Sequence, residues 1–176
     1  KWDTQLNISH NKNRLEKLAT SQVYYDAKVT DILADYCVRN APGMPLGSFY
    51  GYKTGGVNPE TGELIYLDTN EDGEVTANDR TYMGDPNPDF TFGMTNTFQF
   101  YGVTISFLLQ GSYGNDVFNA SRIETEGMYD AKNQSIRVLD RWRRPGMITS
   151  IPKAGFDMKV SDYFVEDGSY IRLKDL

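Results

Sequence analysis

The chain has 176 residues and a formal net charge of −6 at pH 7, which allows one domain or two small ones. Proteins that bind nucleic acid need a basic surface to neutralise phosphates, so this acidic balance argues against that class. No run of residues reaches the length of a transmembrane helix, about 18 consecutive apolar residues. A transmembrane strand remains open, because only every second residue of such a strand has to be apolar. The single cysteine, Cys37, excludes an intrachain disulfide bond.

The chain opens on an alternating segment. Trp2, Leu6 and Ile8 alternate with polar residues, and Thr4 is the polar exception on their side. A period of two predicts a β-strand with one apolar face. Because the alternation begins at the first residues and no signal peptide precedes it, we expect the sequence to be a piece of a longer chain.

The next segment predicts loops with little regular structure. Residues 20–41 mix tyrosine, aspartate and apolar residues without a firm period, and we expect at most a short helix over 27–37. A turn-rich connector at 41–47 leads to two short predicted strands, over 48–53 and 63–67. We therefore expect a large excursion between the first strand and the next long one.

A dense acidic loop lies inside this excursion. Between Gly55 and Asp89 there are nine acidic residues and one basic residue. Residues 68–79 match the twelve-position calcium-binding loop, in which one tight turn supplies most of the about 6–8 oxygen ligands of the ion. The predicted ligands are the side chains of Asp68, Asn70, Asp72 and Asp79 and the backbone carbonyl of Glu74.

Two details of this loop shape the prediction. Gly73 stands where the backbone has to turn sharply, and Asp79 has a shorter reach than the glutamate that usually closes an EF-hand loop. The flanks are strand-like before the loop and loop-like after it, so we expect an EF-hand-like loop without the helix–loop–helix fold. The calcium ion would have a structural role, with an affinity of about 10⁻⁴–10⁻³ M, as in extracellular modules. The alternative is an acidic surface turn that binds no metal.

The clearest elements are two long alternating runs between Phe90 and Ser112, joined by the short turn Tyr101-Gly102. Each run has about ten residues, close to the length of a tilted membrane-spanning strand and well above the about five or six of an average soluble strand. Asn96 is the polar exception on the apolar side, and Leu108 is the apolar exception on the polar side. The polar side carries no charge, as the wet interior of a barrel tolerates. A long hairpin in a soluble sandwich fits this segment equally well.

Past the hairpin the alternation stops and returns only near Tyr170. Residues 123–144 are expected to be helical and to end at Pro145. Long loops on either side of a tight turn are typical of outer-membrane barrels, which have short periplasmic turns and longer extracellular loops. We therefore expect extracellular loops over approximately 20–88 and 113–169, with the hairpin turn on the periplasmic side.

The sequence offers no candidate catalytic residue. The one histidine, His10, lies on the first strand and has an expected structural or interfacial role. Nucleophile-elbow, zinc-protease, P-loop and dinucleotide-binding motifs are absent from the sequence. Trp142, with Arg141, Arg143 and Arg144 beside it, could stack on a sugar or a phosphate, but we favour a role as a loop anchor.

Five segments, in this order and spacing, resemble the SusC/RagA class of TonB-linked outer-membrane transporters of the Bacteroidetes. They are Leu46–Tyr52, Asp68–Arg80, Gly84–Phe90, Gln110–Asp116 and Asp167–Lys174. Any one of them is a weak signal, whereas five in order are a strong one. The resemblance extends over roughly the whole chain, except that residues 21–41 depart from the pattern of the class.

This resemblance implies an all-β fold: a segment of an antiparallel transmembrane β-barrel of about 22 strands whose lumen is plugged. It implies import of glycans or peptides across the bacterial outer membrane and no enzymatic activity. A SusD-like lipoprotein would cap the barrel, and TonB would act through an N-terminal part that this sequence lacks. Membrane lipid would surround the wall.

Two other classes of protein stay open at this point. One is a soluble calcium-stabilised β-rich binding or adhesion module, and the other is an extracellular hydrolase. The soluble module and the barrel differ on where Phe92, Phe98, Ile105 and Phe107 lie: a sandwich buries them in one core, whereas a barrel exposes them to lipid.

Overall fold

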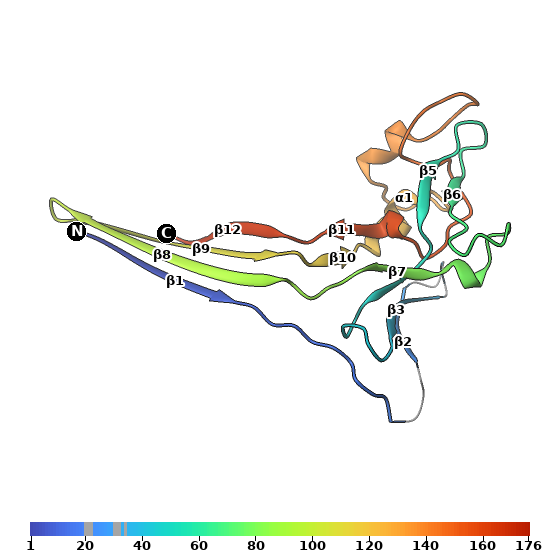
Figure 1. Ribbon diagram of the computed structural model, residues 1–176. Coiled ribbons are helices and arrows are strands. Elements are labelled where there is room, and N and C mark those ends of the chain that lie inside the picture. The colour runs from blue at the N-terminus through green and yellow to red at the C-terminus, as the bar shows by residue number, and fades with distance from the viewer. Residues whose placement is uncertain (20–22, 30–32, 34) are drawn as a thin grey trace.

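The computed structural model describes residues 1–19, 23–29, 33 and 35–176. It has two parts: a long, narrow sheet and, at one end of that sheet, a head of loops and short elements (Figure 1). Both the N-terminus and the turn of the hairpin lie at the end of the sheet far from the head (Figure 1). Among the described residues there is no helix long and apolar enough to cross a membrane.

The long sheet, called here the wall sheet, consists of β1 (Trp2–Ser9), β8 (Phe90–Phe100), β9 (Val103–Tyr113) and β12 (Tyr170–Asp175). Its order is β1-β8-β9-β12, and every neighbouring pair is antiparallel. The predicted first strand and the predicted hairpin are confirmed, and β12 begins where the alternation returns in the sequence. Within the described part of the chain the sheet is open rather than a closed barrel, so β1 and β12 each leave one edge without a neighbouring strand.

The hairpin turn has the backbone that its two residues predict. Tyr101 has φ of 48° and Gly102 has φ of 80°. Two-residue hairpin loops favour positive φ because the resulting turn matches the twist of the strands, and glycine adopts it without strain. The turn is therefore as short as the sequence indicates, and the Tyr101 side chain is 99% exposed at its tip.

The register places the alternating apolar positions of the four strands on one face, and Leu108 is the exception on the other face. Directly paired residues of antiparallel strands share a face, and these pairs join Leu6 to Met94, Met94 to Leu109 and Leu109 to Leu173. The same face carries these further residues: Trp2, Ile8, Phe90, Phe92, Phe98, Phe100, Val103, Ile105, Phe107, Tyr113 and Ile171. No other part of the described chain packs over this face as a core.

The two polar exceptions of the apolar face pair with each other. Thr4 lies directly opposite Asn96, and its hydroxyl donates to Asn96 Oδ1 at 2.7 Å. The Trp2 indole N–H donates to the same oxygen at 3.2 Å. A polar group in an apolar environment is costly unless it is hydrogen-bonded. The hydrogen bond between Thr4 and Asn96 therefore offsets the cost of placing these two side chains on the apolar face.

Among the described residues, the head contains three small sheets. Strands β2 (Tyr24–Lys28), β3 (Tyr36–Asn40), β4 (Phe49–Gly51) and β7 (Thr81–Gly84) form one in the order β2-β3-β4-β7. The pair β5 (Thr54–Val57) and β6 (Leu64–Tyr66) forms the second, and β10 (Asp116–Phe118) with β11 (Val165–Asp167) forms the third. The helices are α1 (Ser121–Glu126) and the 3₁₀ turns η1 (Ala77–Asp79), η2 (Ile136–Asp140) and η3 (Asp162–Phe164).

The short strands predicted at 48–53 and 63–67 are confirmed as β4 and β6, but both helix predictions need correction. Over 27–37 the described residues lie in or beside β2 and β3, which pair with each other, while 30–32 and 34 lie outside the described residues. Over 123–144 the α-helix stops at Glu126, and Met128 has φ of 55°. A left-handed backbone ends an α-helix, so the rest of that segment is loop with the single 3₁₀ turn η2.

The hydrophobic core lies in the head and comes from distant parts of the chain. One cluster contains Leu64, Ile123, Phe156, Met158 and Phe164, and the adjacent one contains Cys37, Phe49, Met83 and Val160. None of the apolar residues of the wall sheet belongs to either cluster. The head is thus folded around its own core, and the wall sheet presents its apolar face to the outside.

Candidate functional site

The apolar face of the wall sheet is uncovered. Trp2, Ile8 and Ile171 are 69%, 67% and 66% exposed, and Ile105 is 43% exposed. Soluble monomers rarely leave a contiguous apolar patch of this extent in water. A soluble sandwich would bury these residues beneath a second sheet, which the described chain does not have. The face therefore fits contact with lipid and argues against the soluble module.

Aromatic rings mark both ends of this face. Near the hairpin turn the rings of Trp2 and Phe98 stack at 5.7 Å, and near the head the rings of Phe90 and Tyr113 stack at 5.3 Å. Between them lies the aliphatic row that contains Met94. Membrane barrels have an apolar band about 25 Å tall between two girdles of aromatic residues. The wall sheet shows this arrangement.

The opposite face of the wall sheet is polar. It carries hydroxyl and amide side chains on β1, β8 and β9, and the hydroxyl oxygens of Thr97 and Ser106 lie 3.0 Å apart. Leu108, the apolar exception, pairs with Thr95 on one side and Asp175 on the other, where β12 has a register shift. Alternation of an apolar outside with a polar inside is the pattern of barrel strands around a wet lumen.

The acidic loop in the head turns its side chains onto its own backbone. Asp68 Oδ2 accepts from Gly73 N at 2.7 Å, and Asp72 Oδ1 accepts from Glu74 N at 3.0 Å. Asn70 Oδ1 accepts from Asp72 N at 3.0 Å. Gly73 has φ of 92°, so the sharp turn predicted at that position is confirmed.

Asp79 closes the loop as the N3 residue of a capping box, in which Thr76 is the N-cap of η1. Its carboxylate is fully buried and accepts from the N–H groups of Thr76 at 2.7 Å and Thr69 at 2.8 Å. The N–H of Asn70 also donates to it, at 3.2 Å. The N–H of Thr76, aided by those of Asn70 and Thr69, holds the pKa of Asp79 below its ordinary value.

The predicted calcium ligands have the right chemistry but are not gathered into a cage. In the part of the chain that the structure describes, no group of three or more histidine, cysteine, aspartate and glutamate side chains lies close enough to hold a metal ion. Asp68, Asn70, Asp72 and Asp79 supply the hard oxygens that calcium prefers. Each of them already accepts a backbone hydrogen bond, so an ion would use their remaining lone pairs and the Glu74 carbonyl. The calcium site stays a prediction.

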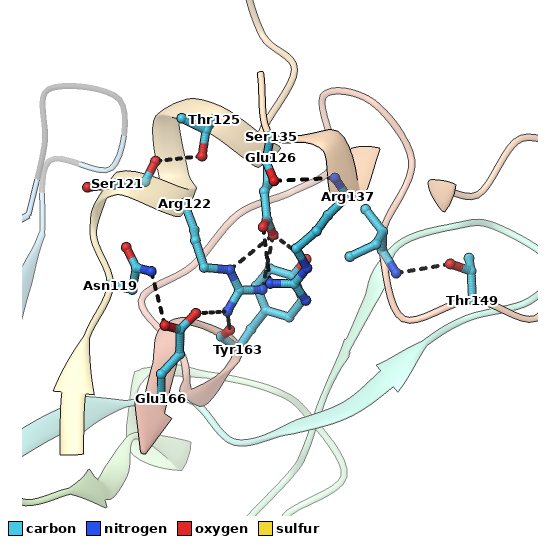
Figure 2. Close-up of polar contacts among 11 residues, drawn as sticks. Asn119, Ser121, Arg122, Thr125, Glu126, Ser135, Arg137, Thr149, Tyr163 and Glu166 are labelled. Carbon is cyan, nitrogen blue, oxygen red and sulfur yellow. Dashed lines mark hydrogen bonds and ion pairs between the residues drawn. The ribbon is translucent and has the colours of Figure 1, made fainter. Parts of the chain in front are cut away.

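A buried ionic network fixes α1 to the segments around it (Figure 2). Glu126 Oε2 accepts from Arg122 Nη2 at 3.0 Å and from the Tyr163 hydroxyl at 3.1 Å, and Glu126 Oε1 pairs with Arg137 Nη1 at 3.2 Å. Arg122 Nη1 donates to the Tyr163 carbonyl at 2.6 Å and pairs with Glu166 at 3.3 Å. Four segments from 121 to 166 are joined through one arginine and one glutamate.

The network also perturbs the groups within it. Burial lowers the pKa of Arg122, but the hydrogen bond and negative charge of Glu126 outweigh this, and the net pKa is raised. Burial, followed by the charge of Glu126, raises the pKa of Tyr163 to about 12. All the charges are paired, and nothing in the arrangement exposes a reactive group. The network is structural, and sequence reasoning missed it because its members are far apart in the chain.

Trp142 anchors its loop, as predicted. Its indole N–H donates to the Pro59 carbonyl at 2.7 Å, and a Cβ added at Gly62 would lie 2.5 Å from its ring carbons. Arg141 and Arg143 donate to the carbonyls of Val138 and Leu139, at 3.2 and 2.6 Å. These contacts hold the loop in place. They give no support to the alternative that Trp142 stacks on a sugar or a phosphate. His10 lies just beyond β1 and contacts the Asp89 carbonyl through Nδ1.

Long antiparallel strands, an exposed apolar face, a polar opposite face and a folded head at one end fit a segment of an outer-membrane barrel protein. Comparison with known proteins identifies the family to which this segment belongs. TonB-dependent receptor P26 of Formosa agariphila is 30% identical over 194 residues, and receptor P3 of the same organism is 28% identical over 192. SusC of Bacteroides thetaiotaomicron, also a TonB-dependent receptor, is 25% identical over 188 residues. The chain belongs to the SusC/RagA-type TonB-dependent receptors.

The comparisons also fix how much of such a receptor the chain represents. The alignments cover 98–99% of this chain but only 18–19% of these curated relatives. The structure of the RagAB peptide transporter matches 98% of this chain with a TM-score of 0.80 and 20% identity, over 20% of that chain. This match shows a shared fold. No family model matches the sequence.

Family membership settles two further expectations. TonB-dependent receptors are outer-membrane proteins, which confirms the predicted location. They are receptors rather than enzymes, which confirms the expectation that the chain is not an enzyme.

Proposed function

We propose that the chain forms a wall segment and outer loops of a receptor that imports glycans or peptides together with a SusD-like lipoprotein. The observation that carries this proposal is the uncovered apolar face with its aromatic ends, opposite a polar face. The head then lies outside the cell, because the tight turn at Tyr101 and Gly102 belongs on the periplasmic side. TonB would drive transport through a part of the receptor outside this chain.

The proposed substrate is a glycan or a peptide. The resemblance to the SusC/RagA class supports either class of substrate, and one structural neighbour is described as a peptide transporter. The direct test is to purify the full-length receptor with its neighbouring lipoprotein and titrate labelled oligosaccharides and peptides against the complex. A stable complex that binds one class saturably supports the proposal. A receptor that captures neither lipoprotein nor substrate contradicts it.

We also propose that residues 68–79 bind a structural calcium ion. Support comes from the spacing of the oxygen ligands and from the sharp turn at Gly73. Calorimetric titration of the full-length receptor should show calcium uptake at about 10⁻⁴–10⁻³ M. Asp72→Ala should weaken this uptake by removing one carboxylate, whereas Glu60→Ala, an acidic change outside the loop, should leave it unchanged. Equal uptake by Asp72→Ala and the parent would remove the site.

A further inference from the structure

Tyrosine and arginine side chains gather on one face of the head sheet formed by β2, β3, β4 and β7. Phe49 and Met83 point from this sheet into the core of the head. Successive residues of a strand point to opposite faces, so their neighbours Tyr50 and Tyr82 lie on the face away from that core, where they pair directly with each other. Two residues that form a second direct pair belong to the same face. The Arg39 site, as it is called here, consists of Tyr25, Arg39, Tyr50 and Tyr82.

The guanidinium group of Arg39 lies over two of the tyrosine rings. Its Cζ is 4.7 Å from the ring centroid of Tyr50 and 5.6 Å from that of Tyr82. The rings of Tyr25 and Tyr50 are 6.2 Å apart, and Tyr25 is 43% exposed. Guanidinium groups stack favourably on aromatic rings, and this stacking restricts their orientation. The site therefore combines a positioned cation with an aromatic surface that is open to solvent.

The positive charge of Arg39 has no carboxylate partner among the described residues. Its one side-chain hydrogen bond there runs from Nη1 to the Tyr82 hydroxyl at 3.4 Å, which is long for a hydrogen bond. Arg80 lies over the same Tyr50 ring, yet it forms an ion pair with Asp35 at 3.2 Å. Charged side chains that are partly withdrawn from water usually have an ionic partner. The described chain supplies this partner to Arg80 and leaves Arg39 without one.

The nitrogens of Arg39 differ in what can reach them. Nε is shielded from solvent and unpaired, so an incoming group cannot reach it. Nη2 is not among the shielded atoms and has no hydrogen-bond partner in the described chain, and Nη1 has only the long contact with Tyr82. These two nitrogens form the end of the guanidinium fork, whose geometry matches the two oxygens of a carboxylate. A carboxylate also carries the single negative charge that one unpaired arginine balances, whereas a phosphate group carries about −1.5 to −2.

We infer that the Arg39 site binds a carboxylate group of the imported substrate, with the tyrosine rings packing against the adjoining part of the ligand. This rests on the proposed function, in which the head lies outside the cell. The chain as a whole has a net charge of −6 and does not attract anions, so selection for a carboxylate has to come from a local cation. Tyr25 and Arg39 lie in the segment 21–41, which departs from the SusC/RagA pattern. The site therefore provides this receptor with a specificity of its own.

The test is calorimetric titration of the full-length receptor, in complex with its lipoprotein, with two matched pairs of probes. One pair is an oligogalacturonate and its methyl ester, and the other is a glutamate-rich peptide and its glutamine analogue. At least one acidic probe should bind about tenfold more tightly than its neutral match, as expected for a hydrogen bond to a charged group. The pair that shows this preference identifies the source of the carboxylate as a glycan or a peptide.

Three variants assign the preference to the site. Arg39→Gln should lower the affinity for the acidic probe about tenfold and change that for its neutral match by less than about twofold. Arg39→Lys keeps the charge but loses the planar fork, so it should retain part of the preference. Arg144→Gln is the control, because it also removes a positive charge from an exposed position of the head, outside the site. It should leave the preference intact.

Several outcomes would overturn the inference. Equal weakening of acidic and neutral probes in Arg39→Gln is one, and faster amide hydrogen exchange in β3 and β4 would then show that Arg39 only holds the sheet together. An acidic preference that survives Arg39→Gln is another. An unaltered receptor that binds neutral probes as tightly as acidic ones contradicts the site and leaves the proposed function intact. A receptor that captures neither the lipoprotein nor any probe contradicts the proposed function itself.

Discussion

Met94→Arg is expected to lower the free energy of unfolding of the receptor in lipid by about 2–4 kcal/mol. This is the cost of placing an arginine on the lipid side near the middle of a barrel wall. Met94 lies in the aliphatic row with Leu6, Leu109 and Leu173, between the aromatic ends of the apolar face. A guanidinium there would have to lose its hydration or distort the bilayer around it.

Thr95→Arg is the matched control for this prediction. Thr95 is the next residue of the same strand, at the same depth, but its side chain lies on the polar face. The folded fraction of both variants can be followed by denaturant titration in lipid vesicles. A smaller loss for Thr95→Arg than for Met94→Arg supports the assignment of the two faces. Equal losses would contradict it.

Glu126→Ala should destabilise the head by up to about 3–5 kcal/mol, the cost of breaking a buried ion pair, because buried Arg122 would keep only the half-exposed Glu166 as an ionic partner. The Glu126 side chain is 2% exposed and contacts Arg122, Arg137 and Tyr163. The readout is amide hydrogen exchange of α1 and β11, which reports local unfolding in the complete receptor.

Glu124→Ala provides the control on the same helix. Glu124 pairs with Lys132, whose side chain is 60% exposed, and exposed pairs contribute about 1 kcal/mol or less. Exchange in α1 should therefore be nearly unchanged. If Glu126→Ala is as mild as Glu124→Ala, the network does not hold the head together.

The wall sheet was largely predictable, because period-two patterning acts within each strand. What the sequence could not provide was the pairing of strands that are far apart in the chain. Thr4 and Asn96 look like two separate defects until the register of β1 and β8 sets them side by side.

The structure of the head was less predictable, because it depends on tertiary contacts rather than on local sequence patterns. The segment after Ile123 has helical composition, yet α1 ends at Glu126. The Glu126 side chain forms ion pairs with Arg122 and Arg137, and the sequence pattern does not indicate these pairs. The acidic loop was foreseen from its spacing, and its turn formed as expected. The use of Asp79 as the buried N3 residue of the capping box of η1 depends on the fold of that loop and its neighbours.

The central claim is that one face of the wall sheet contacts lipid and the other lines a lumen. Spin labels placed singly from residue 103 to 109 of β9 in the full-length receptor in vesicles test it directly, with Cys37 replaced by serine. Oxygen, which partitions into lipid, should collide readily with labels at Val103, Ile105, Phe107 and Leu109, and far less with those at Thr104, Ser106 and Leu108. This period of two is the predicted result. Uniformly low collision rates on both faces would mean that the apolar face is buried in protein, and would contradict the account.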